Sequence, residues 1–456
     1  MSSRPLSQPD AADEPVAVYN GLLEDATLAE ASVERLRAEQ ARRRLSFGER
    51  PLSISLRPNL LSRDRYARAM GAAEALNGAL ARLESALLAE PALRAELDLE
   101  PEEERLALVD PGCRASSTSS RLDSFFGRQV RYVEYNAESP AGIAYEDNLA
   151  EVFQGLPVMQ AFRRRFRLRD VPVRGRQLDA MLSAFGQWGK GERPVIAIVD
   201  WAGLPTATEF DLFCEFFQSQ GVPTVICDPR ELGAGRGGLY AAGRAVNLVY
   251  RRVLTSELLA RADEVRPLLD AYTAGDVCVV NTFRAKLLHK KMSLALLSDE
   301  RYAHLYTTEQ RRAIDGYVPW TRKAVDGPSS RDGRPVGDLL AHCAARREEL
   351  VLKPNDEYGG RGVVLGWTVD QTSWEKALEV AATGSYVVQE AVDVPREPFP
   401  VALDGVQVLD LAVDLDPYLF EGRPWGCLTR LSSSALLNVT AGAGSIVPTF
   451  VVQGAG

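Results

Sequence analysis

The chain has 456 residues, 46% of them hydrophobic and 25% charged, as expected for a folded globular protein of roughly two or three domains. Its formal net charge of −9 argues against a nucleic acid or an anionic membrane surface as the main partner. The six cysteines have no short CxxC spacing and the three histidines share no motif with them, so we expect reduced thiols, no zinc site and a cytoplasmic protein. No run approaches the ~20 apolar residues of a membrane span.

The N-terminal part of the chain predicts a tail followed by helices. Residues 1–14 are rich in Ser, Pro, Asp and Ala, and we expect them to be disordered. Residues 15–115 form a region that we expect to be mainly helical, because 28–38 and 65–97 carry apolar residues at helical spacing among Ala, Arg and Glu. Between these helices, 52–58 alternates apolar and polar residues and predicts a short strand.

The segment 116–175 carries residues that suit a metal ion. It opens with a run of Ser and Thr that predicts a flexible polar loop, and the strictly alternating residues 130–136 predict a strand. Glu134 and Asn136 lie on one face of that strand, and Asp123 could be brought alongside. Hard oxygen ligands of this kind suit Mg²⁺. The alternative is a surface strand end capped by polar residues.

The segment 176–283 predicts a parallel α/β unit of the Rossmann-like type. Three apolar runs are interpreted as its strands, at 194–201, 222–228 and 277–281. A helix is expected over 209–220. The glycine-rich stretch 233–238 is similar in composition to a dinucleotide-binding loop, but it opens no helix, which favours a hairpin or loop.

The segment 284–456 contains residues that suit phosphate. An apolar strand over 350–354 delivers Lys353, and a turn with Gly359, Gly360 and Gly362 leads into a second apolar run. Glycines let backbone N–H groups approach phosphate oxygens, and the lysine supplies a positive charge. An ordinary hairpin with a solvated lysine is the alternative.

Further candidates surround this turn. A helix is expected from Arg284 to Leu297, and it carries Lys291. The strand that ends in Gln389 and Glu390 offers a carboxylate and backbone groups to an adenine edge and a ribose.

These motifs together resemble the circularly permuted ATP-grasp family, and in particular the synthetase half of glutathionylspermidine synthases. The resemblance runs from about 121 to 438 and rests on the order of short motifs: Arg121-x-Asp123, Val133 to Pro140, Lys291, Val351 to Pro354 with its glycine turn, and Gln389-Glu390. It implies an α/β ATP-grasp fold with a Rossmann-like unit ahead of the nucleotide-binding segment. ATP and Mg²⁺ are the implied cofactors.

The resemblance also implies a role for each residue. Asp123, Glu134 and Asn136 would hold Mg²⁺, and Arg121 would face the transferring phosphoryl group. The nucleotide-binding residues would be Lys291, Lys353, Gly359, Gly360, Gly362, Gln389 and Glu390. Arg430 would hold an acyl phosphate or an anionic substrate. Simpler alternatives are an ion pair between Arg121 and Asp123, a solvated Lys291 and an ordinary salt bridge for Arg430.

The implied activity is that of an ATP-dependent carbon–nitrogen ligase. A carboxylate would be phosphorylated to an acyl phosphate, and an amine would displace the phosphate. A kinase-like phosphotransferase and a nucleotide-binding protein without turnover are the alternatives. The Cys/His amidase half of glutathionylspermidine synthases has no counterpart, since Cys113 is the sole cysteine before Arg121 and no histidine precedes it. The identity of the small carboxylate and amine substrates stays open, as does whether the protein is a homo-oligomer.

Overall fold

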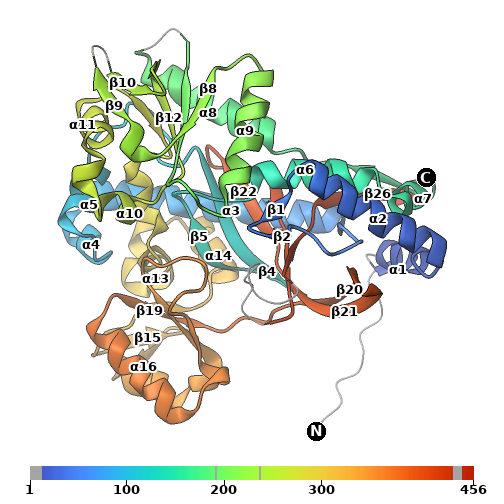
Figure 1. Cartoon of the computed structure of the whole chain (residues 1–456). Helices are drawn as coiled ribbons and strands as arrows, with labels where there is room; N and C mark the ends of the chain where they lie inside the picture. The colour runs from blue at the N-terminus through green and yellow to red at the C-terminus, as the bar shows by residue number, and fades with distance from the viewer. Residues whose placement is uncertain (1–12, 191–192, 236–237, 435–443, 456) are drawn as a thin grey trace.

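A long helix and an antiparallel sheet lie at the centre of the computed structural model, which describes residues 13–190, 193–235, 238–434 and 444–455 (Figure 1). Helix α3 (Arg63–Ala89) begins where the Ser62 side chain accepts a hydrogen bond from the backbone N–H of Arg65. It buries a stripe of small and aliphatic side chains: Ala69, Ala72, Ala73, Leu76, Ala79, Leu80 and Leu83. This stripe shares a core with Leu122 and Tyr132 of the central sheet.

The central sheet combines strands from distant parts of the chain. Its order is β23-β22-β4-β5, and the strands are β4 (Ser119–Phe126), β5 (Val130–Asn136), β22 (Asp416–Phe420) and β23 (Arg423–Leu428). All neighbours are antiparallel, with Arg121 opposite Asn136 and Asp123 opposite Glu134. Tyr418 lies opposite Arg121 on its other side. The predicted alternating strand is therefore confirmed.

A second sheet brings the end of the chain beside its beginning. Its order is β3-β26-β6, and the strands are β3 (Asn59–Ser62), β26 (Thr449–Ala455) and β6 (Phe166–Arg169). Helix α7 (Pro157–Arg163) contacts β6, and α1 (Asp13–Leu22), α2 (Ala26–Arg42) and α6 (Ile143–Gln154) contact α7. Phe162 and Phe450 of this region belong to the same core cluster.

Two expectations for the N-terminal region need correction. The tail predicted over 1–14 falls mostly outside the described residues, but its last two residues belong to α1. The strand predicted over 52–58 is wrong, since that backbone forms a single bridge, between Ser55 and Val401. The side chain of Gln40 bonds both the N–H and the C=O of Ser53, so the backbone there is satisfied without a strand partner.

A four-stranded parallel sheet lies at the top in Figure 1. Its order is β13-β12-β7-β8, and the strands are β7 (Ile196–Val199), β8 (Thr224–Cys227), β12 (Leu248–Arg251) and β13 (Cys278–Val280). The helices of this region are α8 (Arg174–Trp188), α9 (Ala207–Ser219), α10 (Thr255–Leu259) and α11 (Arg266–Ala274). The predicted hairpin is confirmed, since β9 (Gly233–Gly235) pairs with β10 (Gly238–Ala241), which in turn pairs with β11 (Arg244–Val246).

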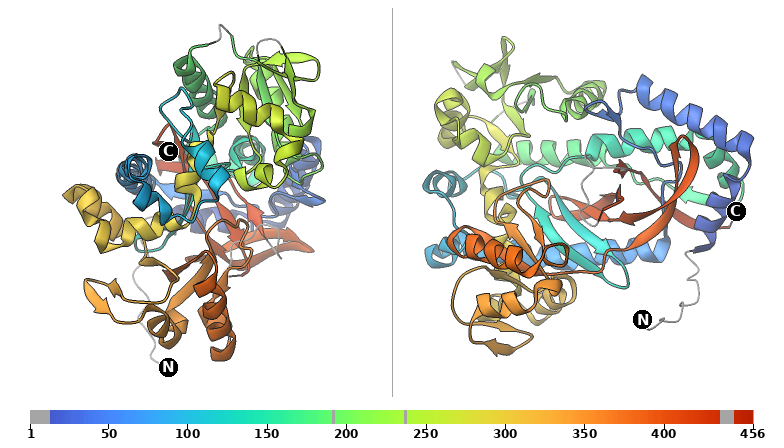
Figure 2. Two further views of the ribbon diagram at one scale, coloured as in Figure 1. Left: turned by 90° about the vertical axis from the view of Figure 1, so that its left-hand side faces the viewer. Right: turned by 60° about the horizontal axis from the view of Figure 1, so that its bottom comes forward.

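A smaller unit with its own core projects below the central sheet (Figure 2). Its sheet has the order β14-β19-β17-β18, with β14 (Thr321–Lys323), β17 (Leu350–Pro354), β18 (Val364–Leu365) and β19 (Tyr386–Glu390). The unit also contains β15 (Ser329–Arg331), β16 (Arg334–Val336), α15 (Leu339–Ala345) and α16 (Gln371–Thr383). Trp374, Leu350 and Val388 are fully buried in its core. The predicted hairpin with Lys353 on its first strand is present.

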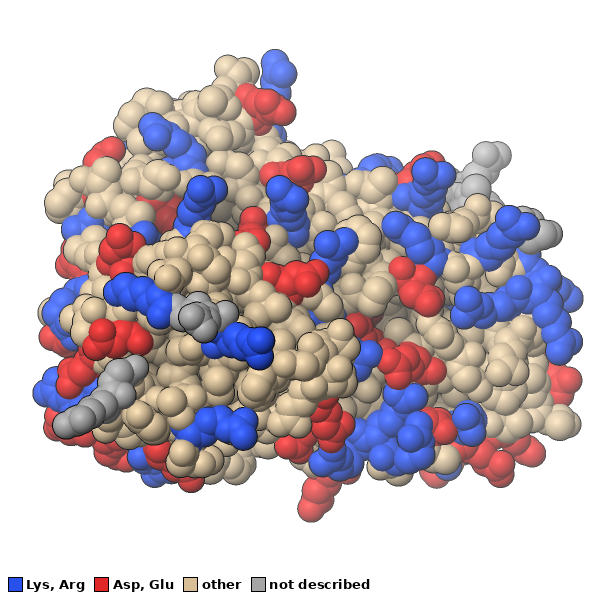
Figure 3. Space-filling view, turned by 90° about the horizontal axis from the view of Figure 1, so that it is seen from above, with Lys and Arg blue, Asp and Glu red and all other residues tan. Residues whose placement is uncertain are grey.

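The rest of the chain connects these units. Another four-stranded sheet has the order β20-β21-β24-β25, with β20 (Arg396–Leu403), β21 (Gly405–Val413), β24 (Arg430–Ser432) and β25 (Ser445–Ile446). The remaining helices and strands are β1 (Ser46–Phe47), β2 (Arg50–Pro51), α4 (Pro91–Ala95), α5 (Pro101–Ala107) and α14 (Thr308–Tyr317). No helix of the described residues is long and apolar enough to cross a membrane. Acidic and basic side chains alternate over most of the face seen from above (Figure 3).

The single helix predicted from Arg284 to Leu297 is wrong. The structure has a 3-10 turn, η3 (Phe283–Ala285), and two short helices, α12 (Lys286–His289) and α13 (Met292–Ser298). Asn355 causes the break, because its backbone C=O accepts the N–H of Lys291 and its side chain accepts the N–H of Met292. Lys290 and Lys291 therefore lie between two helices and point in different directions.

Candidate functional site

Three of the predicted residues meet at the paired ends of β4 and β5. Both oxygens of Asp123 accept hydrogen bonds from Arg121, with Nε at 2.7 Å and Nη2 at 3.0 Å. The amide Nδ2 of Asn136, on the neighbouring strand, lies 2.9 Å from Asp123 Oδ1. Arg121 also donates to the backbone C=O of Ala141, which follows β5. The pairing that we considered as an alternative for Arg121 is thus present, within a larger cluster.

Arg430 joins this cluster from the C-terminal part of the chain. Its Nη2 lies 2.8 Å from Asp123 Oδ2 and 2.9 Å from Asp416 Oδ2, and its Nε lies 2.6 Å from Asp414 Oδ2. Sequence reasoning left Asp414 out and missed Asp416. A signal was available, since Asp414-Leu415-Asp416 repeats the polar-apolar-polar pattern of the two site strands.

The charged groups of the cluster shift one another's pKa values. Burial alone would raise the pKa of Asp123, but Arg121 and Arg430 hold it below its ordinary value. Burial raises the pKa of Asp414, and it raises that of Asp416 well above the ordinary value, with Asp123 adding to the effect. Asp416 Oδ2 is buried and makes no hydrogen bond, despite its closeness to Arg430. That oxygen is instead paired electrostatically with Arg430 Nη2, 2.9 Å away.

Glu134 is held by Lys291 across the break between α12 and α13. The Lys291 Nζ lies 3.0 Å from Glu134 Oε1 and also donates to the backbone C=O of Glu357, at 2.6 Å. Lys291 is only 6% exposed, so it does not belong to a solvated helix face. Lys290 points elsewhere, to Glu103 at 2.8 Å. Of these two lysines, Lys291 is the one beside the predicted metal ligands.

Lys353 connects the smaller unit to the central sheet. Its Nζ donates to the backbone C=O of Val133 at 3.0 Å and to Gln389 Oε1 at 2.7 Å. Both partners are uncharged, and burial lowers the pKa of Lys353 to about 8. Gln389 is itself held by Thr321, to which its Nε2 donates. Such a lysine gains from an added anion, because it has no direct ion pair to give up.

Glu390 is the last residue of the strand that also carries Gln389, but its side chain binds another residue. Its carboxylate accepts a hydrogen bond from Arg331 Nη2 at 2.9 Å. Its backbone N–H donates to the C=O of Trp320. The strand places Glu390 at the rim of the smaller sheet, next to buried Gln389.

The first half of the glycine turn is tied down. Asp356 accepts a hydrogen bond from Lys286 at 2.6 Å, Glu357 binds Lys291 through its carbonyl, and the Tyr358 hydroxyl donates to Glu257 at 3.2 Å. The glycines that follow have φ of +64° (Gly359), +77° (Gly360) and +67° (Gly362), a region that disfavours side chains. Nothing lies within 4 Å of a side chain built at Gly359, whereas one at Gly362 would meet the ring of Pro354 at 2.7 Å.

A second charged cluster lies four residues beyond Glu134. Glu138, His289 and Asp356 bring possible metal-binding atoms within 4.8 Å of one another. Lys286 already lies among them, with Nζ 3.3 Å from Glu138, 2.6 Å from Asp356 and 3.3 Å from Glu103. An ammonium group therefore holds the place that a cation would take, and this cluster is structural.

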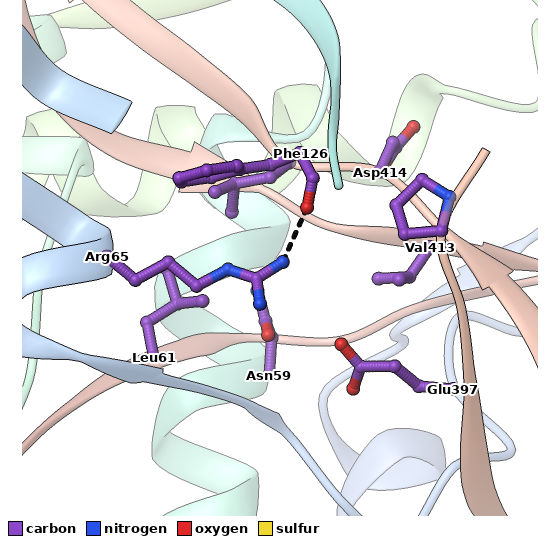
Figure 4. Close-up of a pocket in the computed structure, with 9 residues that line it drawn as sticks. Asn59, Leu61, Arg65, Phe126, Glu397, Val413 and Asp414 are labelled. Carbon is purple, nitrogen blue, oxygen red and sulfur yellow. Dashed lines mark hydrogen bonds between the residues drawn. The ribbon is translucent and has the colours of Figure 1, made fainter. Parts of the chain in front are cut away.

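Two cavities lie outside this constellation. One, of about 10 Å³, borders Asp414 and Arg65, and Figure 4 shows Arg65 bonded to the C=O of Phe126. It has the size of one water molecule. The other, of about 1250 Å³, is lined by α3, α8 and the β22–β23 hairpin, and Tyr135 places it on the face of β5 opposite Glu134.

Comparisons with known proteins agree with a ligase-like fold. No family model matches the chain. Over 333 residues the sequence is 27% identical to the protein named "Putative glutamate–cysteine ligase 2-3" of Frankia alni, covering 69% of this chain and 36% of that protein. The chain thus spans about a third of that relative's length. A glutathione synthetase-like effector, GSS30, of Globodera pallida superposes with a TM-score of 0.60 at 12% identity, over 95% of this chain and 99% of the other.

The two chains share a fold. A weaker superposition, with a TM-score of 0.42 and 10% identity, links the chain to a "Putative gamma-glutamylcysteine synthetase" of Methylobacillus flagellatus KT, over 83% of this chain and 85% of the other. That overlap is too loose to support an argument. The fold is therefore mixed α/β, of a kind also found in a glutathione synthetase-like protein.

The predicted site residues divide into three groups in this fold. Arg121, Asp123, Asn136 and Arg430 are in direct contact, and Glu134 stands on the strand of Asn136. Lys291 binds Glu134, and Lys353 binds the backbone C=O of Val133 on the same strand. The glycine turn follows Lys353 in the chain. Gln389 accepts a hydrogen bond from Lys353, whereas the side chain of Glu390 binds Arg331 instead. The constellation lies where the central sheet meets the smaller unit.

Proposed function

We propose that the chain is an ATP-dependent ligase that joins a carboxylate to an amine through an acyl phosphate. The observation that carries the proposal is the meeting of two sets of groups at one place. The carboxylate and amide side chains of Asp123, Glu134 and Asn136 stand on the central sheet, where Lys291 binds Glu134 and Lys353 binds the backbone C=O of Val133. The first set suits Mg²⁺, and the second suits the phosphates of a nucleotide.

The residues fit the group that they would hold. Mg²⁺ prefers oxygen ligands, and Asp123, Glu134 and Asn136 supply them on adjacent strands in register. Lys353, whose pKa burial lowers to about 8, has only neutral partners and would gain a counter-charge from phosphate.

The chain's own residues then have defined tasks. When bound, Mg²⁺·ATP supplies the phosphoryl group and neutralises part of its charge. Arg121 and Arg430 are fixed by carboxylates, so their guanidinium groups can stabilise charge that develops on the transferring group without reorganisation. Gln389 orients Lys353 through a 2.7 Å hydrogen bond. The residues from Gly359 to Gly362 exclude water when they close over the phosphates.

The fold type within this proposal is a circularly permuted ATP-grasp. Its support is the order of segments, with the metal-type strands at 116–175 ahead of the nucleotide-binding residues at 284–456. The parallel sheet within 176–283 would be the Rossmann-like unit that precedes the nucleotide-binding part. The likeness to a glutathione synthetase-like effector agrees with this assignment of fold type.

The substrates that we propose are a small carboxylate and a small amine, such as an amino acid, a peptide or a polyamine. The support is the set of arginines beside Asp123, which suits an anionic substrate, and the names of the relatives, which refer to glutamate, cysteine and glutathione. We propose a cytoplasmic setting, because the described cysteines are free.

The test is ATP consumption in the presence of pooled amino acids, peptides and polyamines, with products identified by mass. Hydroxylamine traps an acyl phosphate as a hydroxamate, so a ligase yields a hydroxamate when the amine is left out. A stable phosphate ester without hydroxamate would replace the ligase by a kinase-like phosphotransferase. Nucleotide binding without consumption in any pool would favour a protein without turnover.

A further inference from the structure

We infer that the larger cavity, of about 1250 Å³ between α3 and α8, is a second ligand site. It takes a small molecule that carries both an ammonium and a carboxylate group, such as an amino acid or a dipeptide. The cavity lies on the face of β5 opposite Glu134, so a strand of the central sheet separates it from the site described above. The inference does not depend on the proposed function.

Two helices form the long walls of this cavity. Helix α3 contributes residues at helical spacing from Met70 to Glu84, over about 20 Å of helix, and α8 contributes a similar stripe. The turn of the β22–β23 hairpin lies against α8, where the Glu421 side chain accepts hydrogen bonds from Ser183 and Gln187. The fold itself therefore fixes the walls, as in ligand pockets that are largely formed before the ligand binds.

One end of the cavity contains a carboxylate without a counter-charge. Glu84 of α3 lies close to Ser116 and Tyr135, and among the described residues it makes no ion pair. Its Oε1 is buried and makes no hydrogen bond. Burial raises the pKa of Glu84, and Ser116 and the more distant Arg284 only partly oppose this effect. An ammonium group of a ligand would supply the missing counter-charge.

The same end of the cavity contains a guanidinium without an acidic partner. Arg114 lies two residues before Ser116, and its backbone N–H donates to Gln187 Oε1 of α8 at 2.9 Å. That bond fixes the loop 114–117 beside α8. The Arg114 side chain is exposed, and within the described part of the chain it makes no ion pair. It can therefore bind a carboxylate through two parallel hydrogen bonds.

The rest of the lining suits a ligand with one charge of each sign. Acidic and basic side chains line the cavity in nearly equal numbers. Such a surface matches neither a polycation nor a polyanion, because either one would meet charges of its own sign. Leu80 and Phe420 also line the cavity and can contact the apolar part of the ligand. These observations favour an amino acid or a dipeptide.

The experiment screens the standard amino acids and a set of dipeptides for binding to the full chain, by ligand-observed NMR and then by isothermal titration. We expect at least one probe to bind. Its N-acetyl form and its C-terminal amide should each bind about 10- to 100-fold more weakly, because each loses one charge-assisted contact. Hydrogen exchange should show added protection at residues 114–117. A panel in which no probe binds would overturn the inference, as would protection confined to residues 355–362.

Matched variants test the two charged contacts. Glu84→Gln keeps the size of the side chain and should weaken the probe about 10- to 100-fold. Glu74→Gln changes an exposed residue about 15 Å away along the same helix and should leave the affinity unchanged. Arg114→Gln, on the surface, should weaken the probe but not its C-terminal amide.

Two results with these variants would overturn the inference. One is equal affinity in Glu84→Gln and the unmodified protein, and the other is an equal loss in Glu74→Gln and Glu84→Gln. No measurement here involves ATP. Failure of this inference would therefore leave the proposed function unaffected, and failure of the proposed function would leave this inference to be tested in the same way.

Discussion

Lys286 is fully buried and Lys353 is partly buried, and their surroundings shift the pKa values of the two lysines in opposite directions. Lys286 lies among three carboxylates, those of Glu103, Glu138 and Asp356. Burial alone would lower the pKa of Lys286, but these carboxylates raise it above its ordinary value. Lys353 has a carbonyl and an amide oxygen as partners, and burial lowers its pKa to about 8.

This difference in pKa distinguishes Lys286, whose charge is balanced within the protein, from Lys353, whose charge would be balanced by a bound ligand. Lys286 ties together α5, the residues that follow β5, and the glycine turn, and it is fully buried. Its charge is compensated within the protein. The charge of Lys353 lacks such compensation, which costs stability and is recovered when an anion binds.

The largest effect that would test this comparison is on stability. Lys286→Met leaves three carboxylates around a neutral side chain, and we expect a loss of about 3–5 kcal/mol in the free energy of unfolding, as for other broken buried ion pairs. Lys353→Met should keep or increase the stability at neutral pH, since it removes a buried charge without an ion partner in direct contact. Urea unfolding of both variants measures this. A similar loss in the two would remove the distinction.

The next largest expected effect distinguishes two glutamates that lie four residues apart, Glu134 and Glu138. Replacing the first should lower activity, and replacing the second should lower stability. Glu134→Gln should lower ATP turnover by at least about 100-fold, with a smaller loss of stability than Glu138→Gln, because the Glu134 side chain is 24% exposed whereas that of Glu138 is fully buried. Glu138→Gln, four residues later, removes a partner of Lys286 and of Arg251, and its main effect should be a lowered melting temperature. Turnover by Glu134→Gln at the parent rate with any accepted substrate would show that the metal assignment is wrong.

The pH dependence of stability should carry the signature of Lys353. Its pKa is about 8 in the folded protein against an ordinary 10.5, so between these pH values the unfolded chain holds a proton that the folded one lacks. Stability should therefore rise across this window, by about 3 kcal/mol. The difference between wild type and Lys353→Met, followed by urea unfolding from pH 7 to 10.5, isolates the effect. A difference that does not change with pH would mean that Lys353 titrates normally.

The smallest expected effect concerns the glycine turn. Asp356, Glu357 and Tyr358 are held through two side chains and a carbonyl, so the hydrogen exchange of this half of the turn should change little when nucleotide is added. Protection should increase on addition of Mg²⁺·ATP only from Gly359 to Gly362. Hydrogen exchange read by mass spectrometry resolves the two halves, and unchanged exchange from Gly359 to Gly362 would show that this part of the turn does not close over the nucleotide.

Much of the site can be predicted from the sequence, because the alternation of side chains along a strand depends only on neighbouring residues. Glu134 and Asn136 share a face for that reason alone, and Lys353 follows directly from its strand. Asp416 was missed because its neighbours in the cluster are set by strand pairing across the length of the chain. Its partner Ser124, which donates its N–H to Asp416, is 292 residues away.

The errors in the sequence analysis also have long-range causes. The Ser and Thr residues from 116 to 120 predict a flexible loop, but most of them are buried. The side chain of Asn281 accepts hydrogen bonds from Thr118 and Ser119 and satisfies that polar backbone. The helix from Arg284 was misjudged for a similar reason, since Asn355 supplies the group that interrupts it.

The pairing of β4 with β22 sets a limit on when the protein can act during its synthesis. Arg430 reaches Asp123 across 307 residues, so this contact can form only after the ribosome has passed Arg430. Until then, β4 has only β5 beside it, and Asp123 has Arg121 and Asn136 without the arginine that joins it to Asp414 and Asp416. A chain that stops before Arg430 therefore lacks the complete cluster, and under the proposed function it would not consume ATP.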